Sequence, residues 1–250
     1  MHLHPDPAFD RLLGDPGAAD PAAVAAAARR LACGDVAGWE RFWRADGDRA
    51  LAGADERLAA DDVPGARRAL LAAAEAYGFA ADLLGPDEEA HRRNRAAQVA
   101  AFRAAVPLLA EPTAVLGVDA CLFGDARLVC AVVPLPASVP VAAGYARFAV
   151  AALARGVDCL VLGGSAPPAG TCPHGGSPVV LVGWGAAAPT VTAAVRRDHD
   201  LAGVVWCAPV GTDVPVPATG VPTLALPPDA PVDAAMAWIA ALVRSPRGRR

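Results

Sequence analysis

The first part of the chain carries apolar residues at the spacing of amphipathic helices. From about residue 20 to residue 109 they recur between Ala, Arg and acidic residues, which predicts helices that pack through one face. Asp20-Pro21 and Asp62-Val-Pro64 mark two helix starts, because Asp is a favoured N-cap and Pro fits the first turn. The predicted helices span residues 20–33, 36–60, 62–85 and 86–109.

The second part changes to short apolar runs that are rich in Val, Leu, Gly and Pro. Such runs are typical of strands covered on both faces, and their alternation with helical segments predicts a mostly parallel sheet in an α/β fold. The predicted strands span residues 113–118, 127–133, 158–162, 178–183, 201–207 and 221–226. The predicted helices span residues 142–155, 186–197 and 233–244.

The charge distribution changes at the same place in the chain. Residues 1–112 contain 13 Arg and 18 acidic residues, whereas residues 113–250 contain 9 Arg and 8 Asp. We therefore divide the chain into a helical region, residues 1–112, and an α/β region, residues 113–250. Hydrophobic residues make up 54% of the chain, which is enough to bury a sizeable core.

The composition argues against several classes of function. The net charge is −4, and no basic run occurs before the C-terminal RSPRGRR, so nucleic acid is not the expected partner. No uninterrupted apolar run reaches the ~18–20 residues that span a membrane, and the first residues, MHLHPDPAFD, lack the features of a signal peptide. The six cysteines form no C-x-x-C pair, and neither a metal-ligand spacing nor a P-loop is present. We expect a cytoplasmic protein with free thiols, a small-molecule substrate and no metal or cofactor.

The stretch VVLVGWGAAAPT, residues 179–190, reads as a strand, a tight turn and a helix. This is the layout of the nucleophile elbow G-x-S-x-G, in which a strained turn presents a serine hydroxyl. Gly185 occupies the serine position, so the elbow has no hydroxyl to activate.

Two longer stretches resemble the N-terminal helical cap of certain α/β-hydrolases. They are GWERFWRADGDRALAGADERLAADDVPGARRALLAAAEAYGFAADLL and DEEAHRRNRAAQVAAFRAAVPLL. The sequence is similar there to the FrsA-like esterases and the 2,6-dihydroxypseudooxynicotine hydrolase group, whose cap covers an active site at the C-terminal edge of the sheet. LVGWGAA then falls where this family carries G-x-S-x-G, and GVPTLALPPD where it carries the strand before the acidic triad residue. The resemblance implies a truncated α/β-hydrolase-like fold with an N-terminal helical cap.

The chain departs from this family at the catalytic triad, which runs Ser, acid, His along the sequence. Gly185 replaces the serine, and the last histidine, His199, precedes Asp229 at the acid position. A triad in the family's order is therefore impossible. The resemblance leaves four catalytic candidates. Two are Asp229 and His91 of the cap, where the family often has histidine. The others are Gly185, whose missing side chain leaves a small cavity at the elbow, and the Ala186 N–H, one donor of the oxyanion hole.

The loop after the third strand, which supplies the second oxyanion donor in this family, can be placed in two ways. Either the loop is Pro134-Leu135-Pro136, in which proline offers no N–H, or the third strand is largely deleted and VPVAAGY is its remnant. The first placement removes a hydrogen-bond donor, and the second removes most of a strand.

Five further residues are candidate substrate contacts. Trp184, Ser165 and Asp213 are expected at the C-terminal ends of strands, where open parallel sheets bind ligands. Tyr77 and Trp43 are aromatic positions of the predicted helices, and they form either the helix–helix core or the lining of a pocket.

Three functions remain open. The Ala/Arg/Gly/Pro bias, with no Lys, is typical of a GC-rich bacterial genome. Resemblance to serine-less hydrolase relatives of polyketide antibiotic pathways implies a lyase that eliminates acetate from an O-acetylated tetronate and forms an exocyclic alkene. The alternatives are a hydrolase with an atypical nucleophile, such as a cysteine or an activated water, and a non-catalytic pseudoenzyme that binds a small molecule. The expected partner is an acylated, polyketide-derived molecule, and a homodimer is one expected assembly.

Overall fold

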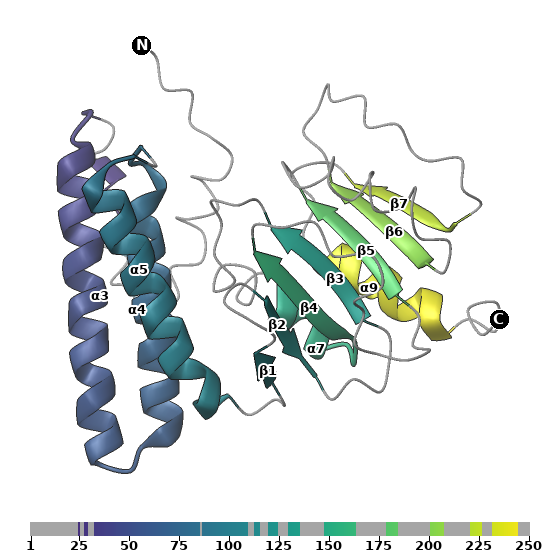
Figure 1. Ribbon diagram of the computed structural model, residues 1–250, viewed down its shortest axis with the longest axis horizontal. Coiled ribbons are helices and arrows are strands. Elements are labelled where there is room, and N and C mark those ends of the chain that lie inside the picture. Colours follow the sequence, from purple (N-terminus) through teal and green to yellow (C-terminus); the bar gives the residue numbers. More distant parts are fainter. Residues whose placement is uncertain are drawn as a thin grey trace. The chain divides into compact units, whose positions relative to one another are not determined.

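The computed structural model divides into two compact units, residues 1–109 and 110–250 (Figure 1). The structure describes residues 25, 28–29, 33–85, 87–109, 113–115, 120–124, 130–135, 148–163, 179–184, 201–207, 221–226 and 232–244.

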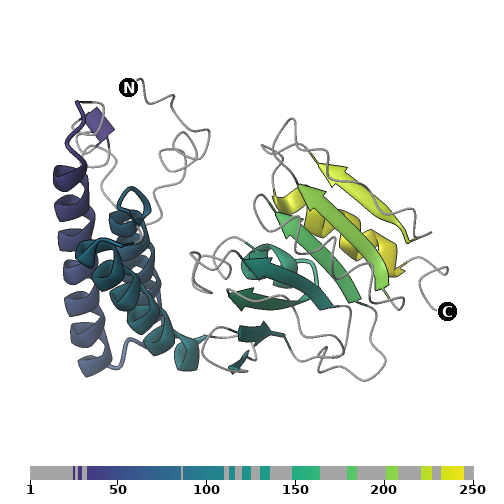
Figure 2. The same cartoon turned by 45° about the horizontal axis from the view of Figure 1, so that its top comes forward.

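The described part of the first unit contains three long helices, α3 (Val36–Ala59), α4 (Val63–Asp82) and α5 (Glu89–Ala105), followed by the short 3₁₀ helix η1 (Val106–Leu108). The helix α4 packs against both α3 and α5, and Figure 2 shows the three side by side. Asp35 and Asp62 cap α3 and α4 by accepting the N–H groups of Gly38 at 2.7 Å and Gly65 at 2.9 Å. The prediction that Asp62 caps a helix is confirmed. The fourth predicted helix begins at Glu89, three residues later than Pro86.

The second unit is built on a seven-stranded sheet in the order β1-β2-β4-β3-β5-β6-β7. Four of the six strand pairings are parallel, while β1 pairs with β2, and β2 with β4, in antiparallel fashion. The strands are β1 (Thr113–Val115), β2 (Ala120–Phe123), β3 (Cys130–Leu135), β4 (Asp158–Gly163), β5 (Val179–Trp184), β6 (Leu201–Cys207) and β7 (Thr223–Leu226).

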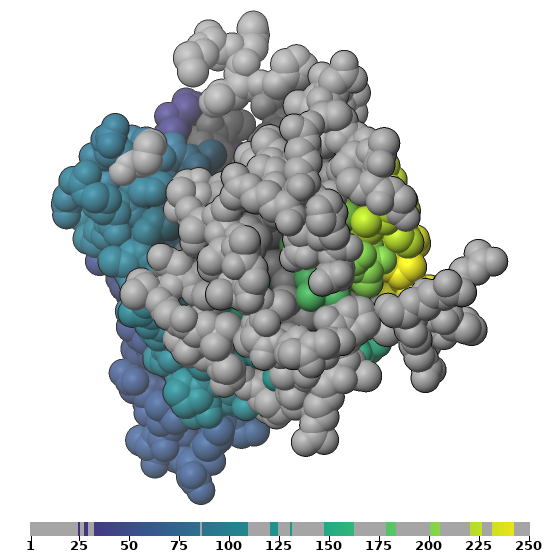
Figure 3. All heavy atoms as spheres, turned by 45° about the vertical axis from the view of Figure 1, so that its right-hand side comes forward, coloured from purple at the N-terminus to yellow at the C-terminus, as the bar shows by residue number. Residues whose placement is uncertain are grey.

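Both faces of the central sheet are covered. Val180, Leu181 and Val182 are consecutive residues of β5 whose side chains alternate between the two faces, and each is at most 4% exposed. On one face lie α7 (Val150–Leu153) and α9 (Val232–Arg244), which contact each other and the sheet. Arg155 and Asp233 link the two helical segments through an ion pair of 3.0 Å. The strand β7 forms an edge of the sheet, and its atoms are visible beside those of α9 in Figure 3.

Three sequence-based predictions for this unit need correction. The strand β2 was not predicted, and it adds two antiparallel pairings, with β1 and β4, to a sheet whose other four pairings are parallel. The third strand is present as β3, so the alternative in which it is largely deleted is wrong. Pro134 and Leu135 are the last residues of this strand instead of part of a loop, because both pair with β4. The predicted helix 186–197, most of the predicted helix 20–33 and residues 142–147 of the predicted helix 142–155 lie outside the described residues.

None of the described helices is both long and apolar enough to cross a membrane.

Candidate functional site

The topology of the sheet marks a place for a ligand between β3 and β5. From β3 the chain continues to β4 on one side, whereas β5 lies on the other side of β3. In open α/β sheets, ligands bind outside the carboxyl ends of the strands at such a point of reversal. The candidate active site is therefore the C-terminal edge of the sheet at β3 and β5.

The backbone ladder between these two strands ends early. The strand β3 pairs with β5 from Cys130–Val179 to Val132–Leu181. It pairs with β4 as far as Leu135, and β5 pairs with β6 as far as Trp184. The two halves of the sheet thus separate over the last residues of β3 and β5, as a crevice at the point of reversal requires.

In the sequence, the turn of the elbow motif directly follows the C-terminal end of β5. Trp184 is the last residue of β5, and Gly185 and Ala186 follow it directly. The remaining candidates of this unit, like Gly185 and Ala186, lie outside the described residues; they are Ser165, Asp213 and Asp229. Their roles stay predictions.

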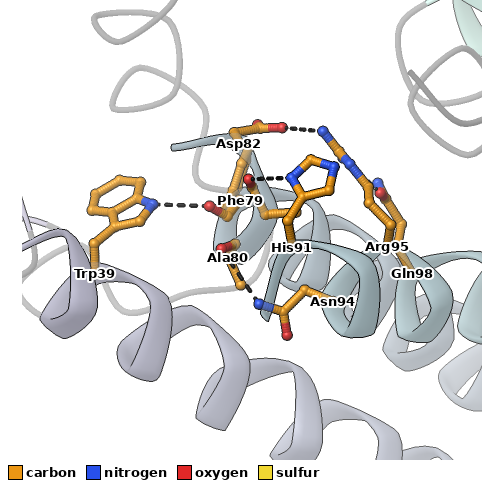
Figure 4. Close-up of polar contacts among 9 residues, drawn as sticks. Trp39, Phe79, Ala80, Asp82, His91, Asn94, Arg95 and Gln98 are labelled. Carbon is orange, nitrogen blue, oxygen red and sulfur yellow. Dashed lines mark hydrogen bonds and ion pairs between the residues drawn. The ribbon is translucent and has the colours of Figure 1, made fainter. Parts of the chain in front are cut away.

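The candidates of the helical unit are described, and His91 belongs to a cluster around the C-terminal end of α4 (Figure 4). The carbonyls at the end of a helix have no partner within the helix. Side chains of neighbouring helices donate to three consecutive carbonyls here: the contacts are Trp39 Nε1 to Phe79 at 2.9 Å, Asn94 Nδ2 to Ala80 at 3.4 Å and His91 Nδ1 to Ala81 at 3.1 Å. Because a carbonyl only accepts, His91 carries a proton on Nδ1, and its Nε2 is directed elsewhere.

An ion pair adjoins His91. Arg95 donates to Asp82 at 2.7 Å and to Gln98 at 2.9 Å. Desolvation raises the pKa of Asp82, while the charges of Arg95 and His91 oppose that shift. A carboxylate at the C-terminal end of a helix also faces the negative end of the helix dipole. Acidic groups with shifted pKa values are enriched at functional sites.

A second polar network is buried between α3 and α5. Asn94 is fully buried, and its amide donates to Glu40 at 3.0 Å while its carbonyl accepts from Arg44 at 3.0 Å. Arg93 adds a contact of 3.4 Å to Glu40. Each charged or polar group in this network has a partner, so it stabilises one register of the two helices.

Tyr77 and Trp43 lie in the core of the helical unit. Tyr77 is 3% exposed, its ring packs on Gly47, and its hydroxyl donates to Asp48 at 2.7 Å. Burial and this hydrogen bond raise the pKa of Tyr77. Trp43 is 2% exposed and packs edge-on against Phe79, with ring centroids 4.7 Å apart. The packing supports the core alternative for both residues, and their role in substrate binding stays a prediction.

Two cysteines of the sheet are poor nucleophiles. Cys121 and Cys159 are buried, and burial together with the neighbouring charge of Asp158 raises the pKa of Cys159. Among the described residues, no three His, Cys, Asp or Glu side chains are grouped to hold a metal ion.

Comparison with known proteins bears on the fold. No family model and no curated protein matches the chain. Among solved structures, the crystal structure of a 2,6-dihydroxy-pseudo-oxynicotine hydrolase is similar, with a TM-score of 0.54 and 13% sequence identity. The chain has the α/β-hydrolase fold. The similarity covers 67% of this chain and only 56% of that hydrolase, so it does not carry over the hydrolase's activity.

Sequence reasoning missed most of the polar residues that the structure brings together around α4 and α5 of the helical unit. Asp82, Arg95, Glu40 and Arg44 were not singled out, because charged positions on predicted helices are usually solvated. One signal was available: Asn94 is the sole Asn of the chain, and it stands within a helix rich in Ala and Arg. An amide retained in such a composition indicates a specific hydrogen-bonding role.

Proposed function

We propose that this chain is a serine-less enzyme of the α/β-hydrolase fold that catalyses a non-hydrolytic elimination in bacterial natural-product biosynthesis. The reaction is the loss of acetate from an O-acetylated tetronate, which leaves an exocyclic alkene. The observation that carries the proposal is the early end of the β3–β5 ladder beside the strand that leads into Gly185. A glycine at that position offers an acyl group room but no nucleophile.

The chemistry needs a base and a stabilised leaving group. We assign the base to Asp229, which takes a proton from the carbon next to the one that carries the acetoxy group. The electron pair of that C–H bond forms the alkene, and the C–O bond breaks so that acetate leaves with its bonding pair. The Ala186 N–H stabilises the charge that develops on the departing acetate. We propose a catalytic role for His91 of the helical unit, and we propose that this unit acts as a cap. Further substrate contacts are proposed for Trp184, Ser165, Asp213, Tyr77 and Trp43.

The decisive experiment follows the origin of the oxygen atoms in acetate. The purified chain is incubated with an O-acetylated tetronate in water enriched in ¹⁸O, and the products are identified by mass spectrometry. Elimination gives the alkene and unlabelled acetate, because the ester C–O bond to the substrate carbon breaks. Hydrolysis at the acyl carbon gives the alcohol and labelled acetate, which would show a hydrolase with an atypical nucleophile. Binding without either product would show a pseudoenzyme.

Two buried thiols of the sheet are unsuited to the cysteine version of the hydrolase alternative. Cys159 is fully buried with a raised pKa, and Cys121 is buried as well. A thiol of this kind stays protonated and out of contact with substrate. Alkylation with iodoacetamide under native conditions is therefore expected to spare Cys121 and Cys159.

A further inference from the structure

The guanidinium of Arg95 is only partly used by its partners in the helical unit. Its Nη1 donates to Gln98 Oε1 at 2.9 Å and its Nη2 donates to Asp82 Oδ1 at 2.7 Å. Its Nε is buried without a hydrogen-bond partner. A carboxylate fits a guanidinium best when both of its oxygens accept parallel hydrogen bonds. Asp82 thus accepts from Nη2, and the Nε–H on the same edge of the guanidinium makes no hydrogen bond.

The neighbours of this edge are polar and lie on one face of α5. His91, Arg95 and Gln98 stand at i, i+4 and i+7, which places them in line along the helix. His91 is held by the Ala81 carbonyl through Nδ1, and Figure 4 shows its second ring nitrogen on the side of Arg95. Gln98 is 3% exposed, and its amide lies over Gly78 of α4. Its side-chain oxygen is therefore a fixed acceptor for the guanidinium.

Asp82 is only weakly bound to Arg95. Its side chain is 44% exposed while that of Arg95 is 19% exposed, so the carboxylate can rotate into solvent without unpacking the helix. Exposed ion pairs contribute little to stability. Desolvation and the end of α4 both disfavour its ionised form where it now lies. Another anion at the same edge gains the second hydrogen bond that Asp82 does not make.

We propose that Arg95, with His91 beside it, is a binding site for a ligand carboxylate or for the paired oxygens of an enolate, which takes Nε and Nη2 together and displaces Asp82. Gln98 positions the guanidinium. The identification of that ligand as a tetronate rests on the proposed function, whereas the site for a carboxylate-like anion does not.

Binding of non-reacting probes to the full chain tests the site. Acetate and the anion of tetronic acid, a vinylogous carboxylate, are titrated by calorimetry into the wild type and three variants. Arg95→Lys keeps the charge but loses the two parallel N–H donors of the guanidinium. We expect this variant to bind each probe about tenfold more weakly. Asp82→Asn removes the competing carboxylate, and we expect up to about fivefold tighter binding. Arg92→Lys is the matched control, since Arg92 pairs with Glu89 on the exposed face of the same helix, and it should bind as the wild type does.

The gain expected for Asp82→Asn keeps the test independent of folding, because a damaged fold does not tighten binding. The proposal is overturned when Asp82→Asn fails to bind more tightly, or when Arg95→Lys and Arg92→Lys bind alike while circular dichroism shows both folded. Absence of alkene from the wild type with the acetylated substrate would instead overturn the proposed function. That result leaves the probe titrations interpretable, because they need no turnover.

Discussion

Val132 of β3 pairs with Leu181 of β5, and this is the last pair between the two strands. Beyond it β3 stays bound to β4, and β5 stays bound to β6. The early end of the β3–β5 ladder is therefore a property of backbone pairing rather than of side-chain size. Pro134, which follows in β3, has no N–H to extend a ladder. The topological argument for a candidate ligand site at this place does not depend on a serine.

The first prediction concerns the space beside β5. Replacing Gly185 with Val fills the position that the proposed mechanism leaves to the acyl group. We expect kcat/KM for alkene formation to fall at least about tenfold, because small displacements of a reacting group cost large factors in rate. Product formation is measured by mass spectrometry, and the thermal midpoint is recorded alongside. Full activity in a folded Gly185→Val variant would remove this position from the site.

The second prediction concerns the buried network of the helical unit. Asn94→Ala leaves the Glu40 carboxylate with only the longer Arg93 contact and leaves Arg44 without its amide partner. We expect the free energy of unfolding to fall by about 2–4 kcal/mol, because buried polar groups that lose a partner are costly. Urea unfolding followed by circular dichroism measures this change.

Arg92→Ala is the control for that loss on the same helix. Its ion pair with Glu89 has side chains 58% and 77% exposed. We expect a change within about 0.5 kcal/mol, as for other exposed pairs. Equal losses in Asn94→Ala and Arg92→Ala would mean that the network does not stabilise the helices.

The sequence predicted the three described long helices of the first unit well, because their signals are local. Caps such as Asp62 and apolar spacing depend on residues within a turn of each other. The strand β2 was missed, because its four residues carry too short a pattern and it is fixed by pairing with β4, which lies 35 or more residues away. Likewise, Trp39 and His91 reach the end of α4 from other helices, and no local rule places them there. Tertiary contacts, and not local propensity, determine the strand β2 and the positions of these two side chains.

The third prediction compares two glycines with positive φ. At Gly124 φ is +110°, and an added Cβ would collide with the buried carboxylate of Asp158. At Gly156 φ is +69°, and no atom lies within 4 Å of an added Cβ. We expect Gly156→Ala to cost about 1 kcal/mol of backbone strain. We expect Gly124→Ala to cost about 3 kcal/mol or more, because strain and collision add. Denaturant titration of both variants measures the difference, and similar losses would contradict the collision.

The last prediction concerns the pH dependence of Asp82. Its folded-state pKa is raised, so its contribution to stability is fully present below the unfolded-state pKa and is lost as pH rises through the folded-state pKa. Asp82→Asn mimics the neutral acid at every pH, and other titrating groups cancel in the comparison with the wild type. The variant should therefore match the wild type below the ordinary pKa of Asp, about 3.9, and should become the more stable of the two as pH rises. Urea titrations at several pH values test this, and a variant that loses stability relative to the wild type toward neutral pH would show that the Arg95 ion pair outweighs the desolvation of Asp82.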